Sequence, residues 1–378
     1  MDSGKVAMNA DDVAINADDV AMNAGDVAIH ADDDAMNADD VAMNADNVAI
    51  HGVIRPNIDA PSPVHYTRSP SSGRRSQVVR QRSAKPSSAG SIPAVASNFP
   101  LPPNFAFHHT VESHGWYRLA PFRWSPDEGV LRRKELLPEG IADLEISVRG
   151  RTMHVAGAAS SVELTRRITR MFQLHLDTSE FLLLTRGSPA HAWVEPAGFG
   201  RLLCGSTLWE DAVKIIATTN TMWSQTVRMV ELLVAKCGRE GAFPTQEDVL
   251  RFSPDELQRD CRLGYRAKSI HALAAKLPVA GSRLPGSPAA TGNGQPATTE
   301  ELFKSYLTLP GIGPYGAAHL LAMDGRHDFI AVDTEFRRFV RETYHGGRKV
   351  SDATMLRRYA KWGRWKYLAY WSELWGSR

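Results

Sequence analysis

The stretch that decides the fold reads Leu309-Pro310-Gly311-Ile312-Gly313-Pro314-Tyr315-Gly316-Ala317-Ala318-His319, and Asp333 follows it. A helix over residues 300–307 is expected to end at Pro310, and a second helix is expected to run from near Pro314 to about residue 323. Proline suits the first position of a helix, and glycines, which lack a Cβ, allow a tight turn. We therefore predict two helices joined by a glycine-rich turn, with the apolar Ile312 anchored in the core.

The start of the second helix is a predicted anion site. The first backbone N–H groups of a helix have no partner within the helix, and they can hold a phosphate oxygen without any side chain. We predict that contacts with a nucleic-acid backbone come from Gly311, Ile312, Gly313, Tyr315 and Gly316.

This segment closely resembles the helix-hairpin-helix motif of the HhH-GPD superfamily of base-excision DNA glycosylases, in which a Gly/Pro-rich loop and an aspartate follow the hairpin. Asp333 lies 20 residues after Gly313, within Val332-Asp333-Thr334, at the family's spacing. The resemblance implies a mainly α-helical, two-lobed glycosylase fold preceded by a small antiparallel β-sheet domain, with Asp333 as the catalytic residue. The alternative is a structural helix turn in which Asp333 only caps the next helix.

Charge is segregated along the chain. Residues 1–50 contain twelve Asp and one base, Lys5, so their net charge is −11. Because the net charge of the whole chain is +2, the remaining residues carry +13. Such a basic remainder favours a polyanionic partner through counterion release. With the resemblance, this predicts double-stranded DNA containing a damaged base as the partner of a monomer. The sequence contains no run of eighteen apolar residues, so no membrane span is predicted. Its three cysteines are widely spaced and predict neither a disulfide framework nor a zinc site.

The first hundred residues lie outside the resemblance. Residues 8–49 repeat a seven-residue unit six times, beginning Met8-Asn9-Ala10-Asp11-Asp12-Val13-Ala14, without the apolar seam of a coiled coil. We expect residues 1–50 to be a disordered acidic segment and residues 51–100 to be a flexible basic linker rich in Ser, Pro and Arg. The basic linker is consistent with a nuclear address, and an organelle transit peptide or a plain linker are the alternatives.

Two globular domains are expected after the linker, over residues 101–195 and 196–378. Strands are predicted around residues 130–136, 144–148 and 152–156, because apolar and polar residues alternate there, and a helix is predicted over residues 161–174. This small sheet resembles the N-terminal domain of oxoguanine and methyladenine glycosylases. The body that follows is expected to be helical, with a loop over residues 281–298.

Two further patches extend the resemblance to the oxoguanine glycosylases. Asn220 stands between two predicted helices, where the family has an asparagine that fills the gap left by an extruded base. Leu263-Gly264-Tyr265-Arg266-Ala267 matches a loop whose tyrosine wedges beside the lesion and whose arginine contacts the unpaired partner base. A flipped base leaves a hole that such side chains can fill. The alternatives are a helix cap for Asn220 and a core position for Tyr265.

The C-terminal run of aromatic residues has two interpretations. The family's substrate-pocket positions align with Tyr370 and Leu374, and Trp371 lies beside them. Aromatic rings that faced a pocket could stack on an electron-poor base. Packing of a terminal helix in the core is the interpretation we favour for most of the run.

Several departures from the family bear on the reaction. Tyr315 stands where bifunctional members have a lysine nucleophile, and a phenol cannot form an imine. Leu119-Ala120-Pro121 and Gln225 differ from the oxoguanine pattern. The resemblance then implies a monofunctional glycosylase without metal or redox cofactor, acting on alkylated ahead of oxidised purines. The alternatives are an oxoguanine-type glycosylase with a changed pocket and a non-catalytic DNA-binding protein.

Overall fold

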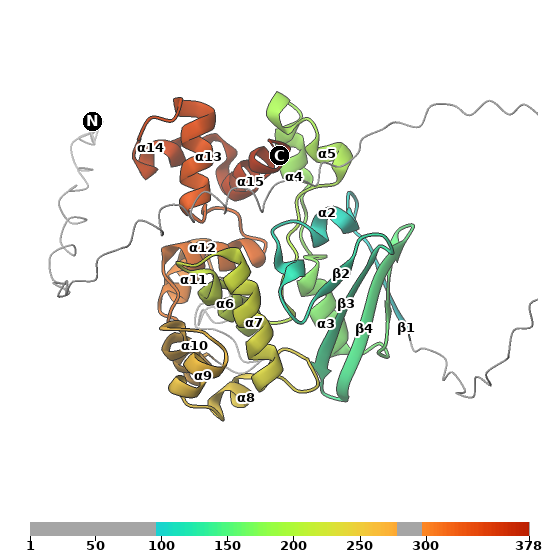
Figure 1. Ribbon diagram of the computed structural model, residues 1–378. Coiled ribbons are helices and arrows are strands. Elements are labelled where there is room, and N and C mark those ends of the chain that lie inside the picture. Colours follow the sequence, from blue (N-terminus) through green and yellow to red (C-terminus); the bar gives the residue numbers. More distant parts are fainter. Residues whose placement is uncertain (1–95, 278–296, 378) are drawn as a thin grey trace, which may run out of the picture. The chain divides into compact units, whose positions relative to one another are not determined.

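A five-stranded antiparallel sheet opens the described part of the chain, which in this computed structural model comprises residues 96–277 and 297–377 (Figure 1). The strands are β1 (Ala96–Pro100), β2 (Arg123–Ser125), β3 (Val130–Leu137), β4 (Gly140–Arg149) and β5 (Thr152–Ala156), in the order β1-β5-β4-β3-β2. Leu131 lies opposite Ile146, which lies opposite Val155, and all three are buried. This row forms the core face of the sheet.

The three predicted strands are present, and the sheet begins earlier in the chain than the predicted end of the linker. Residues 96–100, which the sequence placed in the linker, form β1 and pair with β5 from Ala96 opposite Ala156 to Pro100 opposite Thr152. Alternation of exposed and buried residues in this short strand was masked by its Ser, Asn and Pro content. Helix α3 (Val162–Met171) follows, and the Ser161 hydroxyl caps it by accepting a hydrogen bond from the N–H of Leu164 at 3.1 Å.

Short helices connect the sheet to the helical body. They are α2 (Phe107–Val111), η2 (Trp116–Arg118), α4 (Ser179–Thr185), η3 (Pro189–His191) and α5 (Val194–Ala197). The segment 113–116 is held by hydrogen bonds to distant elements, because the Ser113 carbonyl accepts from the indole N–H of both Trp371 and Trp375 at 2.8 Å. The start of the sheet region is therefore tied to the end of the chain.

The helical body begins with α6 (Leu208–Thr218), α7 (Trp223–Cys237), α8 (Gln246–Leu250), α9 (Pro254–Asp260) and α10 (Arg266–Lys276). A capping box opens α9, since Ser253 and Glu256 each accept the other's backbone N–H. On the apolar face of α7, Val230 and Val234 are buried, and Trp223 and Val227 pack against the core. The acidic repeat, most of the basic linker and residues 278–296 lie outside the described residues; Thr298 of the predicted loop caps α11.

The predicted helix pair is present as α11 (Thr299–Leu307) and α12 (Pro314–Met323). Every residue of α12 from Gly316 onward is buried. A helix that is buried on all its faces is packed against other elements on several sides. Leu320 and Leu321 pack in the core shared with the sheet and α6, whereas Ala318 and Ala322 pack in the core of the C-terminal helices. Helix α12 therefore joins two hydrophobic cores.

The C-terminal lobe consists of α13 (Thr334–His345), α14 (Asp352–Arg357), η4 (Ala360–Trp365) and α15 (Lys366–Gly376). Most of its aromatic rings are buried, including Tyr359, Trp362 and Trp365. The core interpretation of the aromatic run is confirmed for these positions. Across residues 96–277 and 297–377, no helix is both long and apolar enough to cross a membrane.

Candidate active site

The hairpin between α11 and α12 depends on Gly311. Its φ is +78°, a left-handed conformation that favours glycine. A Cβ at this position would lie 2.7 Å from the Cβ of Ser269 on α10 and 3.1 Å from a methyl of Ile216 on α6. Ile312 is buried, as predicted. The turn is thus seated against α6 and α10 through one glycine and one apolar anchor.

Gly313 has the opposite environment. It is exposed, has an ordinary φ of −95°, and a Cβ built on it meets no atom within 4 Å. It is the N-cap of α12, and its carbonyl accepts the first helical hydrogen bond from Ala317 at 2.9 Å. Within the described residues, the N–H groups of Gly313, Tyr315 and Gly316 have no hydrogen-bond acceptor. These unpaired amides and the open surface at Gly313 fit an approaching anion.

Gly316 also has a packing role. A Cβ there would lie 3.1 Å from Ile215 and 3.3 Å from Ile312. Its missing side chain lets α12 approach α6 closely. Of the predicted turn residues, Ile312 and the Cα of Gly316 therefore face the core, while Gly311, Gly313 and half-buried Tyr315 border the surface.

Asp333 is the N-cap of α13. Its Oδ1 accepts a hydrogen bond from the N–H of Phe336 at 2.7 Å. Burial raises the pKa of Asp333 above the usual carboxyl range, while the hydrogen bond from Phe336 opposes that shift by stabilising the charged form. The structural role that the sequence offered as the alternative, an N-cap of the next helix, is present, and this cap orients the carboxylate.

The side chain of Tyr315 lies near Asp333. Burial raises the pKa of Tyr315, and the negative charge of Asp333 raises it further. The pKa of Tyr367 and that of Tyr370 on α15 are likewise raised, first by burial and also by the charge of Asp333. The charge of Asp333 therefore acts on side chains of α12 and α15, although 18 to 37 residues separate these positions in sequence.

Asn220 and Tyr265 form a second surface feature. Asn220 lies in the turn between α6 and α7 with φ +46°, and Met222, not Asn220, is the N-cap of α7. Tyr265 is 58% exposed, so neither the helix-cap nor the core alternative holds. The Asn220 amide donates to the Tyr265 hydroxyl at 3.3 Å. The two predicted gap-filling residues thus stand together at the surface.

Arg266 holds this surface feature in place. The side chain is only 7% exposed, and its guanidinium donates to the backbone carbonyls of Thr219 and Asn220, the latter at 3.1 Å. Its central carbon also lies 4.7 Å from the centre of the Tyr265 ring. In this conformation Arg266 orients the turn that carries Asn220, and a contact with an unpaired base stays a prediction.

The three predicted substrate-pocket residues of α15 have different surroundings. Tyr370 is buried, and its ring packs against Phe336 at 5.0 Å. Leu374 is buried in the C-terminal core, and no contact links it to Asp333. Trp371 is half-buried and stacks on Tyr367 at 5.7 Å with an angle of 12°. Tyr367 lies on the side of α15 that faces α12, with its ring centre 6.1 Å from that of His319.

Sequence reasoning gave no role to three residues that border this region. His319 lies one helical turn after Tyr315, with ring centres 5.7 Å apart. Trp116 of η2 stacks on His319 at 5.6 Å, and His114 lies 5.7 Å from His319. The i, i+4 spacing of Tyr315 and His319 was a usable signal. Nothing local in sequence indicated that residues 114–116 would meet α12.

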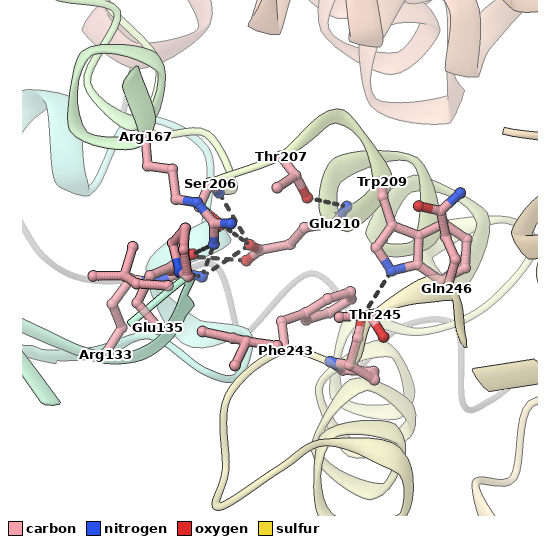
Figure 2. Close-up of a pocket in the computed structure, with 14 residues that line it drawn as sticks. Arg133, Glu135, Arg167, Ser206, Thr207, Trp209, Glu210, Phe243, Thr245 and Gln246 are labelled. Carbon is pink, nitrogen blue, oxygen red and sulfur yellow. Dashed lines mark hydrogen bonds and ion pairs between the residues drawn. The ribbon is translucent and has the colours of Figure 1, made fainter. Parts of the chain in front are cut away.

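Asp333 lines neither of two cavities in the described part of the chain. One of about 290 Å³ separates β3 from the starts of α6 and α8 (Figure 2). Its floor is an ion network in which buried Arg133 contacts Glu135 at 2.7 Å and Glu210 at 2.9 Å, and Glu210 contacts Lys214 at 2.7 Å. Burial opposes ionisation of Glu210, but Arg133 and Lys214 hold its pKa well below the usual range. These opposite charges are paired with one another. The pairing indicates that the network holds the sheet against the helices and has no role in binding.

Comparison with family models matches residues 213–364 to the model described as HhH-GPD superfamily base excision DNA repair protein. This range contains the Asn220 turn, the Tyr265 loop, the hairpin and Asp333, and it ends before α15. A comparison with curated proteins gave no significant match.

Three solved structures are similar in fold. The structure of MBOgg1 in complex with a low affinity DNA ligand has a TM-score of 0.59 at 19% identity, covering 75% of this chain and 96% of the other. The apo 8-oxoguanine glycosylase/lyase of Clostridium acetobutylicum has 0.57 at 16% identity, covering 72% and 93%. The 3-methyladenine DNA glycosylase of Archaeoglobus fulgidus has 0.58 at 21% identity, covering 74% and 98%. These likenesses establish the fold.

Proposed function

We propose that this chain, whose residues 213–364 match the model of the HhH-GPD superfamily of base excision DNA repair proteins, is a monofunctional DNA glycosylase that releases damaged purines from double-stranded DNA. The proposal rests on the half-buried carboxylate of Asp333, the N-cap of α13, whose charge acts on Tyr315 in the first turn of α12, where the free amides of the hairpin lie. A protein that only bound DNA would need the hairpin, but it would not need this carboxylate.

The hairpin positions the duplex. The unpaired N–H groups of Gly313, Tyr315 and Gly316 lie at the N-terminus of α12, where the helix dipole also favours negative charge. A phosphate oxygen bound there carries no sequence information, so the contact serves all duplexes alike. It places the sugar of one nucleotide near Asp333, which lies close to the same helix end.

Asn220 and Tyr265 then hold the duplex open. Extrusion of a base leaves a gap that costs stacking energy, and an exposed aromatic ring can occupy that gap. Tyr265 has the required exposure, and its hydroxyl is braced by Asn220 at 3.3 Å. Because Arg266 fixes the turn that carries Asn220, the wedge is ready before DNA arrives.

Asp333 supports the chemical step. The C1′–N bond breaks with its electron pair going to the leaving base, and positive charge develops at C1′. The carboxylate stabilises that charge, and it can accept a proton from the water that adds to C1′. Tyr315 cannot replace water as an amine nucleophile, so the product is an intact abasic site.

The experiment is a panel of duplexes that each carry one lesion, treated with the enzyme and then with alkali to reveal abasic sites. Release of at least one damaged purine by the wild type, with loss in Asp333→Asn, is expected. Duplex binding without release from any lesion would identify a non-catalytic DNA-binding protein. Release confined to 8-oxoguanine would identify an oxoguanine-type enzyme with a changed pocket.

A further inference from the structure

A cavity of about 550 Å³ is lined by the start of α11, the segment that precedes Asp333, α14 and the start of α15. Asp328, Phe329 and Ile330 of that segment line it, whereas Asp333 does not. Its volume falls in the range of small-molecule sites, about 300–1,000 Å³. The proposed base release gives this cavity no role, so its lining is considered by itself.

Charges of opposite sign come to this cavity from different elements. Glu300 belongs to α11 and Asp328 to the segment after α12, whereas Arg357 belongs to α14 and Lys366 to α15. Across residues 96–277 and 297–377, no ion pair joins either acid to either base. In the same part of the chain the Lys366 ammonium has no hydrogen-bond or ion-pair partner. The acidic and basic groups therefore stand apart from one another.

The cavity of Figure 2 differs in this respect. There Arg133 pairs with Glu210 at 2.9 Å, and Glu210 pairs with Lys214 at 2.7 Å, so the protein neutralises its own charges. Lys366 is half-buried, so it has lost part of its hydration without gaining a carboxylate. An anionic group that entered the cavity beside α15 would supply the missing partner.

Phe329 gives the cavity an aromatic wall. Its ring stacks on Phe303, with ring centres 4.5 Å apart and an angle of 8° between the planes. Phe303 does not line the cavity, so Phe329 meets the cavity with its edge or with its other face. Ile330 and Leu356 add apolar atoms to the lining. A planar ring that entered the cavity could continue the aromatic stack.

Asp328 is a hydrogen-bond acceptor on the acidic side of the cavity. Its carboxylate is half-buried and accepts from the Thr299 hydroxyl at 3.2 Å. That hydroxyl accepts in turn from Nη1 of Arg326 at 3.2 Å, so the carboxylate is held in place. A carboxylate can accept two N–H bonds at once, and carboxylates accept from the amino groups of bases. The acidic side therefore fits N–H donors, and the basic side fits an anion.

We propose that this cavity is a nucleotide-binding site separate from the Asp333 centre. The base continues the stack at Phe329 with its N–H groups toward Asp328, and the phosphate contacts Lys366 and Arg357. Guanine is the favoured base, because its N1–H and its 2-amino group are adjacent and can donate to one carboxylate. A free nucleoside monophosphate and the terminal nucleotide of a single strand share this chemistry, and the test includes both.

An acidic peptide from a partner protein is the alternative occupant. It would use Arg357 and Lys366, but it would leave the aromatic wall without a planar partner. Its further negative charges would also lie near Glu300 and Asp328, and like charges oppose association. A nucleotide confines its negative charge to one end and presents hydrogen-bond donors at the other. The lining therefore favours a nucleotide.

The test is equilibrium binding to the full chain, measured by calorimetry. Guanosine 5′-monophosphate is expected to bind, and Lys366→Gln should weaken its binding by about tenfold, the scale of a hydrogen bond to a charged group. Guanosine, which lacks the phosphate, should bind both proteins within about twofold of one another, which isolates the contact between phosphate and Lys366. Absence of nucleotide binding by the wild type, or equal losses for both ligands in the variant, would overturn the proposal.

Two further variants separate the phosphate contact from effects on folding. Arg357→Gln changes an exposed side chain of the same cavity and should also weaken binding of the monophosphate more than that of guanosine. Lys361→Gln makes the matched replacement at an exposed position outside the cavity and should leave both affinities unchanged. A loss in Lys361→Gln as large as that in Lys366→Gln would show a general charge effect and refute the site.

The base contact is tested with Asp328→Asn. Asparagine keeps an oxygen for the Thr299 hydroxyl but cannot accept two N–H bonds from guanine. The variant should therefore lose the preference for guanosine over adenosine 5′-monophosphate. An unchanged preference would contradict the placement of the base beside Asp328.

Competition identifies where the nucleotide is bound and which source of it is preferred. Saturation with an abasic-site duplex should leave binding of the monophosphate unchanged, and displacement would place the nucleotide in the Asp333 centre and overturn the proposal. A 5′-phosphorylated tetranucleotide that begins with dG and binds more tightly than the monophosphate, with the same loss in Lys366→Gln, would identify a strand end as the source. Binding of an Asp-rich peptide without binding of any nucleotide would identify a peptide site instead. None of these measurements requires base release, so they are independent of the proposed glycosylase activity.

Discussion

The amide of Asn220 donates to the hydroxyl of Tyr265 at 3.3 Å, which joins the turn after α6 to the loop before α10. Tyr265 remains 58% exposed despite this contact. An exposed aromatic ring whose hydroxyl is braced loses little conformational entropy when it enters a base stack. The pair therefore has the form of a preformed wedge.

Tyr265→Ala is expected to slow base release from a fully paired lesion by roughly tenfold, because one base–ring stack is worth about 1–3 kcal/mol. The loss should shrink for a lesion opposite a mismatch, which is extruded more easily. Tyr265→Phe, which keeps the ring, should retain most activity. Single-turnover release on matched and mismatched duplexes measures the difference, and an equal loss on both would argue against a wedge.

Asp333→Asn should reduce base release by at least about a hundredfold, the scale of a lost electrostatic contact in a transition state, while duplex affinity changes little. Folding should not suffer. Asparagine caps helices about as well as aspartate, and the substitution removes a half-buried carboxylate whose folded-state pKa is raised. Melting temperature and binding to an abasic-site duplex are the controls, and full activity in the variant would disprove the mechanism.

The pH dependence follows from the same raised pKa. Release requires the Asp333 carboxylate, so activity should fall as pH drops through its folded-state pKa, at a pH above the ordinary value of about 3.9. For stability the sign is opposite to that of a salt-bridged Asp. The ionised group costs stability above its folded pKa, and this cost disappears as pH falls below the unfolded value. The stability difference between Asp333→Asn and wild type should therefore vanish at low pH.

Gly313→Val is expected to weaken binding to damaged and undamaged duplexes alike by about tenfold, because the side chain blocks a phosphate contact that does not read sequence. The melting temperature should stay unchanged, since open space surrounds a Cβ at this position. Gly311→Ala is the contrasting variant. Its positive φ and its 2.7 Å approach to Ser269 predict a loss of about 1–3 kcal/mol of stability. Weakened binding to only one lesion would contradict the phosphate role.

Borohydride should trap no covalent enzyme–DNA adduct, and the product strand should stay intact at neutral pH. Tyr315 offers a phenol where an amine would be needed for an imine at C1′. Among the described lysines, Lys214 is paired with Glu210 and Lys304 lies near Glu300, and none contacts Tyr315 or Asp333. Strand nicking that is lost on substitution of one lysine would reveal a bifunctional enzyme, whereas nicking that survives every such change indicates a contaminating nuclease.

Local chemistry made much of this fold predictable. The bounds of α12 follow from Pro314 and the preceding glycines, and the alternation around Leu144 and Ile146 predicted β4. Asp333 was singled out by its spacing from the hairpin and by the family resemblance. The structure shows in addition that it caps α13. Strand β1 escaped prediction because Pro100 and its polar neighbours read as linker.

Long-range packing was not predictable in the same way. Nothing near Trp116 in sequence indicates that it stacks on His319, more than two hundred residues later. Likewise the spacing that aligned Tyr370 with a pocket position could not show that its ring packs on Phe336, while the Tyr367 ring lies 6.1 Å from His319 of α12. Such contacts depend on how three distant segments pack together. The hydrophobic periodicity and the composition of each segment do not reveal that packing.

The buried ion network of Figure 2 limits how this protein could have been assembled in evolution. Arg133 comes from the sheet, and its partner Glu210 comes from α6. Removing one member of a buried pair typically costs about 3–5 kcal/mol, a large part of a domain's stability. A recombination event that exchanged the sheet for one lacking this arginine would leave Glu210 underneutralised. The stability of the helical body therefore depends on the sheet, although only the helices match the family model.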